Sequence, residues 1–294
     1  MAVFTKVDRA ELEAFLTTYD IGTLESFEGI AQGIENTNYH LFTSKGRYIL
    51  TIFEKRVRVE DLPFIFAYQN HLSSHEIVCP QVVANRNREE INFLKDKAAA
   101  ITTFLHGKDL TQPEITPQHC RELGRVQAQM HLAAYDFEMR RENGVGFMAW
   151  KAMADDCRDR ADEVYPGLAQ MIDDELAYLA AHLPHNLPSG AVHADMFPDN
   201  VFFQDEKLSG VIDFYFSCTA EWVYDLAITV NAWCFDKERR FMPECYDALK
   251  TAYMSARPLT DQEADFLPLY CRAAALRFLM TRLSDWLFHP GDEF

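Results

Sequence analysis

The sequence is short of positive charge. Lys and Arg total 28 against 45 Asp and Glu, so the 294-residue chain carries a formal net charge of −17. An acidic surface repels the phosphate backbone of nucleic acids, which argues against a nucleic-acid partner. Most of this charge is expected on the solvated surface, although it also suits a site that binds a cationic or zwitterionic substrate.

The chain also lacks a cysteine framework and a long apolar segment. Its seven cysteines are scattered, and no two of them stand in a C-x-x-C spacing. Such a set is typical of small core residues in a reducing compartment rather than of disulfides. No stretch reaches the roughly 18 uninterrupted apolar residues of a membrane span. We therefore expect a cytoplasmic protein that needs no membrane partner and is a monomer or a homodimer.

The first hundred residues have the texture of a sheet. Residues 39–43 and 47–53 are β-rich runs joined by Ser44-Lys-Gly46, which predicts a hairpin. Further strand-like runs follow at 81–85, 90–94 and 99–105. Helical spacing occurs only at 8–19 and from Leu62 to Leu72, so the first third of the chain is predicted to be rich in β-structure.

From Thr116 onward the pattern turns helical. Thr116 is suited to cap a helix and Pro117 suits its first turn. Helical spacing of apolar residues recurs at 168–182, 222–235, 241–255 and 261–288. The sequence therefore predicts an α+β protein of two lobes, with a β-rich N-terminal lobe over 1–105 and a mainly helical C-terminal lobe over 106–294.

The residues that carry chemistry gather in one short block. An apolar strand ends in His193-Ala-Asp195, a Pro-containing loop follows, Asn200 closes it, and a second strand delivers Asp213. Phosphoryl transfer needs a carboxylate that orients the acceptor hydroxyl and takes its proton, together with oxygen ligands that hold Mg²⁺ against the nucleotide phosphates. The spacing H-x-D-x-x-x-x-N followed by I-D-F supplies this set. It predicts Asp195 as the base, Asn200 and Asp213 as metal ligands, and His193 as a brace for the loop.

These motifs resemble those of the aminoglycoside phosphotransferase and choline kinase branch of the protein-kinase-like fold. Leu123–His131 is similar to the L-G-x-x-x-A-x-x-H helix that precedes the catalytic loop in that branch, and Asp225 to an Asp that supports the loop. Phe104-Leu-His-Gly107 resembles the hinge whose backbone receives adenine. The resemblance implies a bilobal kinase-like fold, ATP and Mg²⁺ as cofactors, and nucleotide contacts from Phe104 and Leu105.

Within this branch the chain is similar to the bacterial homoserine kinases that use this fold. The similarity lies in Gln32–Tyr39, Tyr48–Glu54, Asp61–Phe64 and Arg282–Trp286. It implies transfer of the γ-phosphate of ATP to the hydroxyl of L-homoserine, giving O-phospho-L-homoserine in threonine biosynthesis. Two alternatives stay open: a kinase of the same branch that acts on choline, ethanolamine, a sugar or an aminoglycoside, and a nucleotide-binding pseudokinase.

The N-terminal lobe departs from the usual kinase pattern. Thr51 occupies the position where kinases of this fold place a phosphate-binding lysine, so phosphate contact must come from elsewhere. The expected replacement is Lys55, and the alternatives are Arg56 and Arg47.

The Asn-Thr-Asn triplet is predicted to lie at a turn over the phosphates. Backbone N–H groups and side-chain dipoles can cradle anions at such a turn. The predicted contacts are Asn36, Thr37 and Asn38. The alternative is a hairpin turn that needs Asn only for its shape.

An amino-acid acceptor requires a carboxylate that faces its ammonium group and an Arg or amide that faces its carboxylate. Suitable side chains follow the catalytic block, and the sequence does not rank them. The candidates are Tyr215, Glu221, Asn231, Trp233, Arg272 and Arg277.

Overall fold

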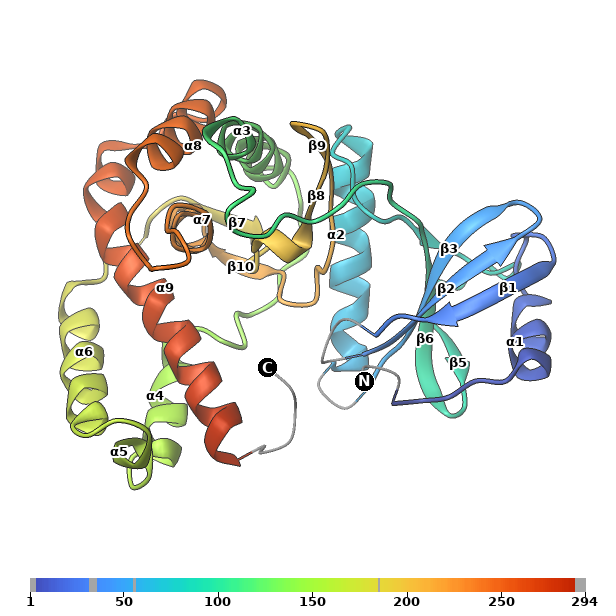
Figure 1. The fold of residues 1–294 in the computed structure, drawn as a ribbon, viewed down its shortest axis with the longest axis horizontal. Coiled ribbons are helices and arrows are strands. Elements are labelled where there is room, and N and C mark those ends of the chain that lie inside the picture. The colour runs from blue at the N-terminus through green and yellow to red at the C-terminus, as the bar shows by residue number, and fades with distance from the viewer. Residues whose placement is uncertain (1–3, 32–35, 55–56, 185, 289–294) are drawn as a thin grey trace. The chain divides into compact units, whose positions relative to one another are not determined.

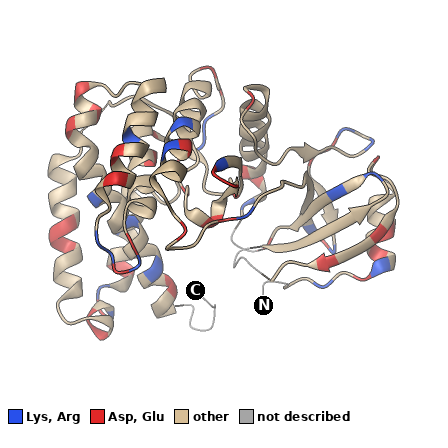
Figure 2. Cartoon of the chain, turned by 45° about the horizontal axis from the view of Figure 1, so that its top comes forward, with Lys and Arg blue, Asp and Glu red and all other residues tan. Residues whose placement is uncertain are grey.

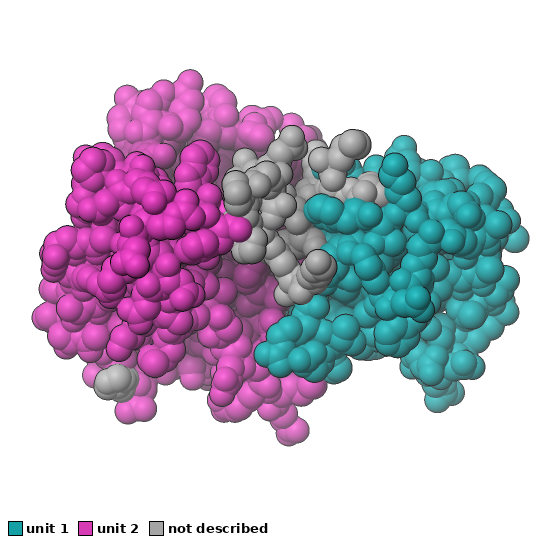
Figure 3. All heavy atoms as spheres, turned by 90° about the horizontal axis from the view of Figure 1, so that it is seen from below, with its two compact units in different colours: residues 1–106, 294 teal, residues 107–293 magenta. Residues whose placement is uncertain are grey.

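The structure is a computed structural model that describes residues 4–31, 36–54, 57–184 and 186–288. The chain forms two compact units, residues 1–106 and residues 107–293 (Figure 3). This division falls one residue from the boundary that the sequence predicts. The assignment of nucleotide binding to the first unit and substrate binding to the second stays a prediction.

The first unit is built on an antiparallel sheet in the strand order β1-β2-β3-β6-β4, with β5 paired to β6 (Figure 1). The predicted hairpin is confirmed, because β2 and β3 pair in a register that sets Leu41 opposite Tyr48. The strands are β1 (Leu24–Gly29), β2 (Thr37–Thr43), β3 (Gly46–Ile52), β4 (Val82–Val83), β5 (Asn92–Leu94) and β6 (Lys97–Thr103).

One face of this sheet packs on α1 (Arg9–Leu16). Leu50 and Ile52 of β3 share a buried cluster with Leu12 and Leu16 of α1. Because alternate residues of a strand point to opposite faces, Thr51 faces away from α1. The slot of the missing lysine therefore lies on the face opposite α1.

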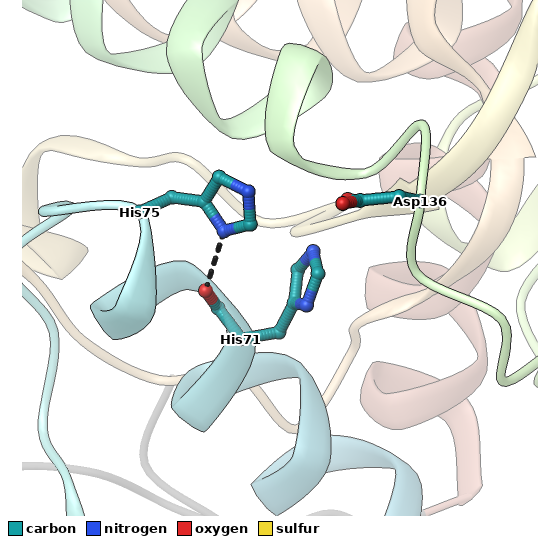
Figure 4. Close-up of side chains that lie close together, drawn as sticks. All are labelled: His71, His75 and Asp136. Carbon is teal, nitrogen blue, oxygen red and sulfur yellow. Dashed lines mark hydrogen bonds between the residues drawn. The ribbon is translucent and has the colours of Figure 1, made fainter.

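The helix α2 (Leu62–Ser74) follows β3 after the short turn η1 (Val59–Asp61). Phe66 of α2 lies with its ring centroid 6.4 Å from that of Phe53, just past the end of β3. At the end of α2, Nδ1 of His75 lies 2.9 Å from the carbonyl oxygen of His71 (Figure 4). The same carbonyl oxygen also accepts from the backbone N–H of His75 at 3.3 Å and from the hydroxyl of Ser74 at 2.7 Å, so several donors meet at this helix end.

The second unit is mainly helical, as the sequence predicts. Its long last helix passes α4, α6 and α7, and α3 packs on α8 (Figure 1). The helices are α3 (Pro117–Ala133), α4 (Phe147–Cys157), α5 (Ala161–Val164), α6 (Leu168–His182), α7 (Trp222–Trp233), α8 (Pro243–Ala256) and α9 (Asp261–Phe288). Two small ladders complete the unit: β7 (Ser189–Val192) pairs with β10 (Cys218–Glu221), and β8 (Val201–Gln204) with β9 (Lys207–Val211).

The start of α3 is the one that the sequence predicts. Thr116 is the N-cap, its hydroxyl accepts from the N–H of His119, and Pro117 occupies the first turn. The sequence pattern does not predict α4 and α5. Gly146 and Arg160 precede these helices, and neither provides a side-chain cap. Their starts therefore lack the signal that marks α3.

Acidic and basic residues occur on helices and loops of each unit (Figure 2). The seven cysteines are free thiols, and only Cys271 is not fully buried. Over the described ranges, no helix is both long and apolar enough to cross a bilayer.

Candidate active site

The loop after β7 brings the predicted catalytic and metal-binding residues to one place. Asn200 Nδ2 donates to the backbone oxygen of Asp195 at 2.9 Å and to its carboxylate Oδ2 at 3.0 Å. The N–H of Ile212 donates to the carbonyl oxygen of Asn200 at 2.9 Å. Asp213 directly follows Ile212, so these bonds place its backbone beside the loop that carries Asp195.

His193 braces the same loop from inside. The N–H of Asp195 donates to Nδ1 of His193 at 3.2 Å, so the ring proton lies on Nε2, which donates to the carbonyl oxygen of Ile212 at 2.9 Å. Burial lowers the pKa of His193, and the nearby Arg277 charge adds to the lowering. A neutral, fully buried ring with both nitrogens engaged suits a brace rather than a proton carrier.

Ala194 has a backbone conformation that few alanines adopt. Its φ of 62° lies in the left-handed region, which costs a residue with a side chain about 1–3 kcal/mol. The N–H of Ala194 donates to Oδ1 of Asp225 at 2.6 Å, and its carbonyl oxygen accepts from Nη1 of Arg277. The two charged side chains thus hold the strained residue that precedes Asp195.

Asp225 is a fully buried carboxylate at the base of the loop. Its Oδ2 accepts from Gln127 at 2.8 Å and from Nε2 of His131 at 2.9 Å. Burial raises the pKa of Asp225, but the hydrogen bonds from His131 and Gln127 outweigh burial and hold the pKa below its ordinary value. Burial lowers the pKa of His131, whose Nδ1 accepts from the hydroxyl of Tyr253 at 2.7 Å. The carboxylate is therefore anionic and His131 is a neutral structural partner.

Asn200 and Asp213 form a donor set that fits Mg²⁺. Because Nδ2 of Asn200 donates to Asp195, its amide oxygen is the atom that a metal ion would meet. Asp213 stands two residues after β9 with a φ of 62°, in the left-handed region that is costly for a residue with a side chain. Carboxylate and amide oxygens are the protein ligands that Mg²⁺ prefers.

In the first unit, the Asn-Thr-Asn triplet is tied into the end of the sheet. Asn36 Oδ1 accepts from the N–H of Glu54 at 3.1 Å, and the Thr37 hydroxyl donates to the Glu54 carboxylate at 2.8 Å. Thr51 donates to Oδ1 of Asn38 at 2.8 Å. These bonds favour a structural role for the three side chains, and their phosphate contacts stay predictions.

The predicted adenine contacts follow β6 directly. Phe104 and Leu105 are half-buried, and the guanidinium of Arg47 lies 3.9 Å from the centre of the Phe104 ring. Lys55 and Arg56 lie outside the described residues. The nucleotide contacts of all these residues stay predictions.

Sequence reasoning did not foresee the ion pair between Lys97 and Glu54. Lys97 Nζ contacts the Glu54 carboxylate, which also accepts from Thr5 at 2.7 Å. Lys97 and Ala99 are two residues apart on β6, so their side chains point to the same face of the sheet. Ala99 belongs to the buried cluster that contains α1 residues, so this is the face that packs on α1. The pair therefore lies on the face opposite Thr51 and does not supply the missing lysine.

Three of the six acceptor candidates lie at the catalytic block. Trp233 Nε1 donates to the carbonyl oxygen of Met196 at 2.7 Å, and Arg277 contacts Ala194. Tyr215 lies two residues after Asp213, and its carbonyl oxygen accepts from Arg141 at 2.8 Å.

The other three candidates are engaged elsewhere. Asn231 donates to the carbonyl oxygen of Cys271 at 2.6 Å, and the Arg272 guanidinium pairs with Glu175. Glu221 lies opposite Ser189 at the start of β7, which is the end of the ladder away from the catalytic loop. These positions do not favour contact between the three side chains and the acceptor, and such contacts stay predictions.

Comparison with known proteins first shows to which broad class of proteins this chain belongs. Residues 26–259 match the family described as "Phosphotransferase enzyme family". The solved structure of an amicoumacin kinase in complex with AMP-PNP, Ca²⁺ and Ami superimposes with a TM-score of 0.74 at 16% identity, covering 94% of this chain and 86% of that one. The predicted kinase-like α+β fold is confirmed, and the chain is a phosphotransferase.

Relatives of similar sequence show to which family of phosphotransferases the chain belongs. The homoserine kinase of Parvibaculum lavamentivorans is 49% identical over 294 residues, which cover 100% of this chain and 91% of that protein. The homoserine kinase of Xanthobacter autotrophicus is 50% identical over 290 residues, which cover 99% of this chain and 90% of that protein. The chain belongs to the homoserine kinase family.

Proposed function

We propose that this protein is an ATP-dependent homoserine kinase, which transfers the γ-phosphate of ATP to the hydroxyl of L-homoserine and yields O-phospho-L-homoserine for threonine biosynthesis. The observation that carries the proposal is the identity of 49–50% with curated homoserine kinases over nearly the whole chain. The geometry of the catalytic block supports it. The reaction draws on ATP, and we assign it to the cytoplasm.

Asp195 is the base in this proposal. Its carboxylate orients the acceptor hydroxyl and takes its proton as the hydroxyl oxygen bonds to the γ-phosphorus. The bond from that phosphorus to the bridging oxygen of ATP breaks, and ADP leaves. Because phosphoryl transfer needs mainly positioning and charge stabilisation, a weakly basic, well-held carboxylate suffices. Asn200 supplies the hold through its 3.0 Å bond to Oδ2.

Asn200 and Asp213 would hold Mg²⁺, which when bound neutralises charge on the nucleotide phosphates. In the first unit, the backbone around Asn36 and the residues Phe104 and Leu105 are assigned to the nucleotide. This division assigns the metal and acceptor to the second unit and the nucleotide to the first.

The acceptor is tested by ADP release. Wild-type protein with Mg²⁺ and ATP is assayed with L-homoserine, choline, ethanolamine, a hexose and an aminoglycoside at equal concentrations. We expect kcat/KM for homoserine to exceed that of every other acceptor by at least about 100-fold, because a site that pairs both charged groups of an amino acid rejects acceptors without them. A higher value for any other acceptor contradicts the proposal, and release with none indicates a pseudokinase.

A further inference from the structure

Arg277 on α9 reaches the catalytic loop from a helix that the kinase motifs do not include. Its side chain is 1% exposed, and Nη1 donates to the carbonyl oxygen of Ala194. Nη2 lies 4.0 Å from Oδ1 of Asp195. The same guanidinium therefore faces both the backbone before the base and the base itself.

A buried guanidinium needs a countercharge. Isolated buried charges are costly, so they persist where they are paired or hydrogen-bonded. Among the described residues, Asp195 brings a carboxylate oxygen to 4.0 Å from the Arg277 guanidinium. The rings of Phe216 and Phe278 also face the guanidinium, with centres 5.2 Å and 4.5 Å from its carbon, and its charge acts on the buried hydroxyl of Tyr224. Asp195 is thus the anion against which Arg277 is buried.

Arg277 and Asp225 together bind the two polar backbone groups of Ala194. Asp225 binds the N–H of this residue at 2.6 Å and Arg277 binds its carbonyl oxygen. The N–H belongs to the peptide group before Ala194, and the carbonyl belongs to the peptide group that leads into Asp195. The buried charges of Asp225 and Arg277 therefore hold the peptide groups on the two sides of Ala194. The orientation of these peptide groups in turn helps to set the direction of the Asp195 side chain.

We propose that Arg277 is a positioning residue for phosphoryl transfer, which holds the carboxylate of Asp195 in its productive orientation through the Ala194 carbonyl group and through its own charge. The inference rests on the proposed function of Asp195 as the base. It differs from the sequence-based expectation that Arg277 binds the acceptor. A substrate carboxylate cannot reach a side chain that is 1% exposed and whose two terminal nitrogens face Ala194 and Asp195.

The test compares Arg277→Gln and Arg277→Lys with a matched control, Arg125→Gln. Arg125 lies on α3 in the same unit, is about half exposed and pairs with Glu122. Rates are expressed per Mg·ATP-binding site measured by calorimetry, so that a loss of folded protein does not count as a loss of catalysis. For Arg277→Gln, kcat should fall about 100-fold, as expected when a reacting group is displaced by about 1 Å. KM for homoserine should stay within about threefold of wild type, because the acceptor is not bound by this side chain.

Arg277→Lys should restore part of the rate. A lysine retains the charge but lacks the planar fork that faces two groups at once, so kcat should lie within about tenfold below wild type. Arg125→Gln should leave both constants unchanged. A wild-type kcat in Arg277→Gln overturns the proposal, as does a raised KM with kcat retained, which would make Arg277 an acceptor contact.

A stability cycle keeps the inference testable if Arg277→Gln yields too little active protein. The melting temperatures of Asp195→Asn, Arg277→Gln and the double variant are compared with wild type. If the two charges balance each other, the double variant loses less than the sum of the single losses. Additive losses contradict the pairing. If wild type phosphorylates another acceptor and not homoserine, the proposed substrate is wrong. The kcat and KM of the Arg277 variants are then measured with that acceptor, and they still test the role of Arg277.

Discussion

At the scale of single residues, the catalytic block assigns different work to side chains that lie close together. Asp195 and Asn200 share a hydrogen bond of 3.0 Å, while Asp213 follows Ile212, whose backbone N–H donates to the carbonyl oxygen of Asn200. The proposal makes Asp195 the base and Asp213 a metal ligand. Because both are carboxylates, the same chemical change at each one separates the two roles.

We expect Asp195→Asn to lower kcat by about 10²–10⁴-fold, the contribution of a positioned general base. Its affinity for Mg·ATP should stay near wild type, since neither metal ligand is replaced and the oxygen of the new amide can still accept the hydrogen bond from Asn200. Calorimetric titration with a non-hydrolysable ATP analogue and a coupled assay measure the two quantities. Asp247→Asn, an exposed change on α8, is the control and should alter neither.

Asp213→Asn should behave in the opposite way. Loss of a charged ligand should weaken Mg·ATP binding at least about tenfold. Replacing a residue that only hydrogen-bonds to a metal ligand already lowers metal affinity by about that factor. Equal loss of nucleotide affinity in the Asp195 and Asp213 variants would contradict the division of roles.

At the scale of elements, the site depends on the close packing of α3 and α8. α3 carries Gln127 and His131 to Asp225, and α8 carries Tyr253 to His131. The contact is close at Gly124, where an added Cβ would meet the backbone carbonyl of Leu249. A backbone group cannot rotate away as a side chain can, so the two helices would have to separate.

We expect Gly124→Ala to lower the free energy of unfolding by about 1–3 kcal/mol through overpacking, although alanine is by itself the better helix former. Gly144→Ala is the matched control, because an added Cβ there meets nothing within 4 Å. Its effect should stay within about 0.5 kcal/mol. Urea unfolding of both variants measures the difference, and a stability of Gly124→Ala equal to wild type would show that the helices adjust freely.

The elements also show where sequence reasoning succeeds and where it stops. Thr116 and Pro117 predict the start of α3 because capping is a local interaction that sequence neighbours encode. The start of α4 at Phe147 has Gly146 and no side-chain cap before it, so packing against α9 and α6 stabilises it instead. The spacing from His193 to Asn200 predicts the catalytic block for the same local reason.

Long-range contacts carry no such signal. Arg277 and Ala194 are separated by 83 residues, and the sequence offers Arg277 only as one of several acceptor candidates. The side chains of Asn36 and Thr37 look like anion ligands in a turn until the structure ties them to Glu54. Pairing across the fold decides both cases.

At the scale of the whole molecule, the polar network around His131 links stability to pH. Burial lowers the pKa of His131, partly opposed by its hydrogen bond with Asp225, and Arg257 and Glu263 are the other charged groups that face it. The folded protein therefore keeps this ring neutral, whereas the unfolded chain protonates it below about pH 6.5. Its contribution to stability is complete above that pH and is lost as the pH falls toward the lowered folded-state pKa.

We expect the free energy of unfolding to decrease between about pH 7 and pH 5, and the slope to shrink in His131→Gln by as much as about 1.4 kcal/mol per pH unit. Glutamine can still donate to Asp225 but does not titrate. His182→Gln, at the exposed end of α6, serves as the control and should keep the wild-type slope. Denaturant unfolding at several pH values measures the slopes, and an unchanged slope in His131→Gln would show that this ring does not govern acid sensitivity.

The central claim is that the chain transfers a phosphoryl group to homoserine with Asp195 as the base. Phosphorus NMR of a reaction containing the protein, Mg²⁺, ATP and L-homoserine tests it directly, since the phosphate monoester and ADP have separate resonances. We predict that wild type produces O-phospho-L-homoserine and ADP in equal amounts and that Asp195→Asn forms both at least about 100-fold more slowly. ADP and inorganic phosphate without the ester, or the same ester formed at the wild-type rate by Asp195→Asn, would contradict the account.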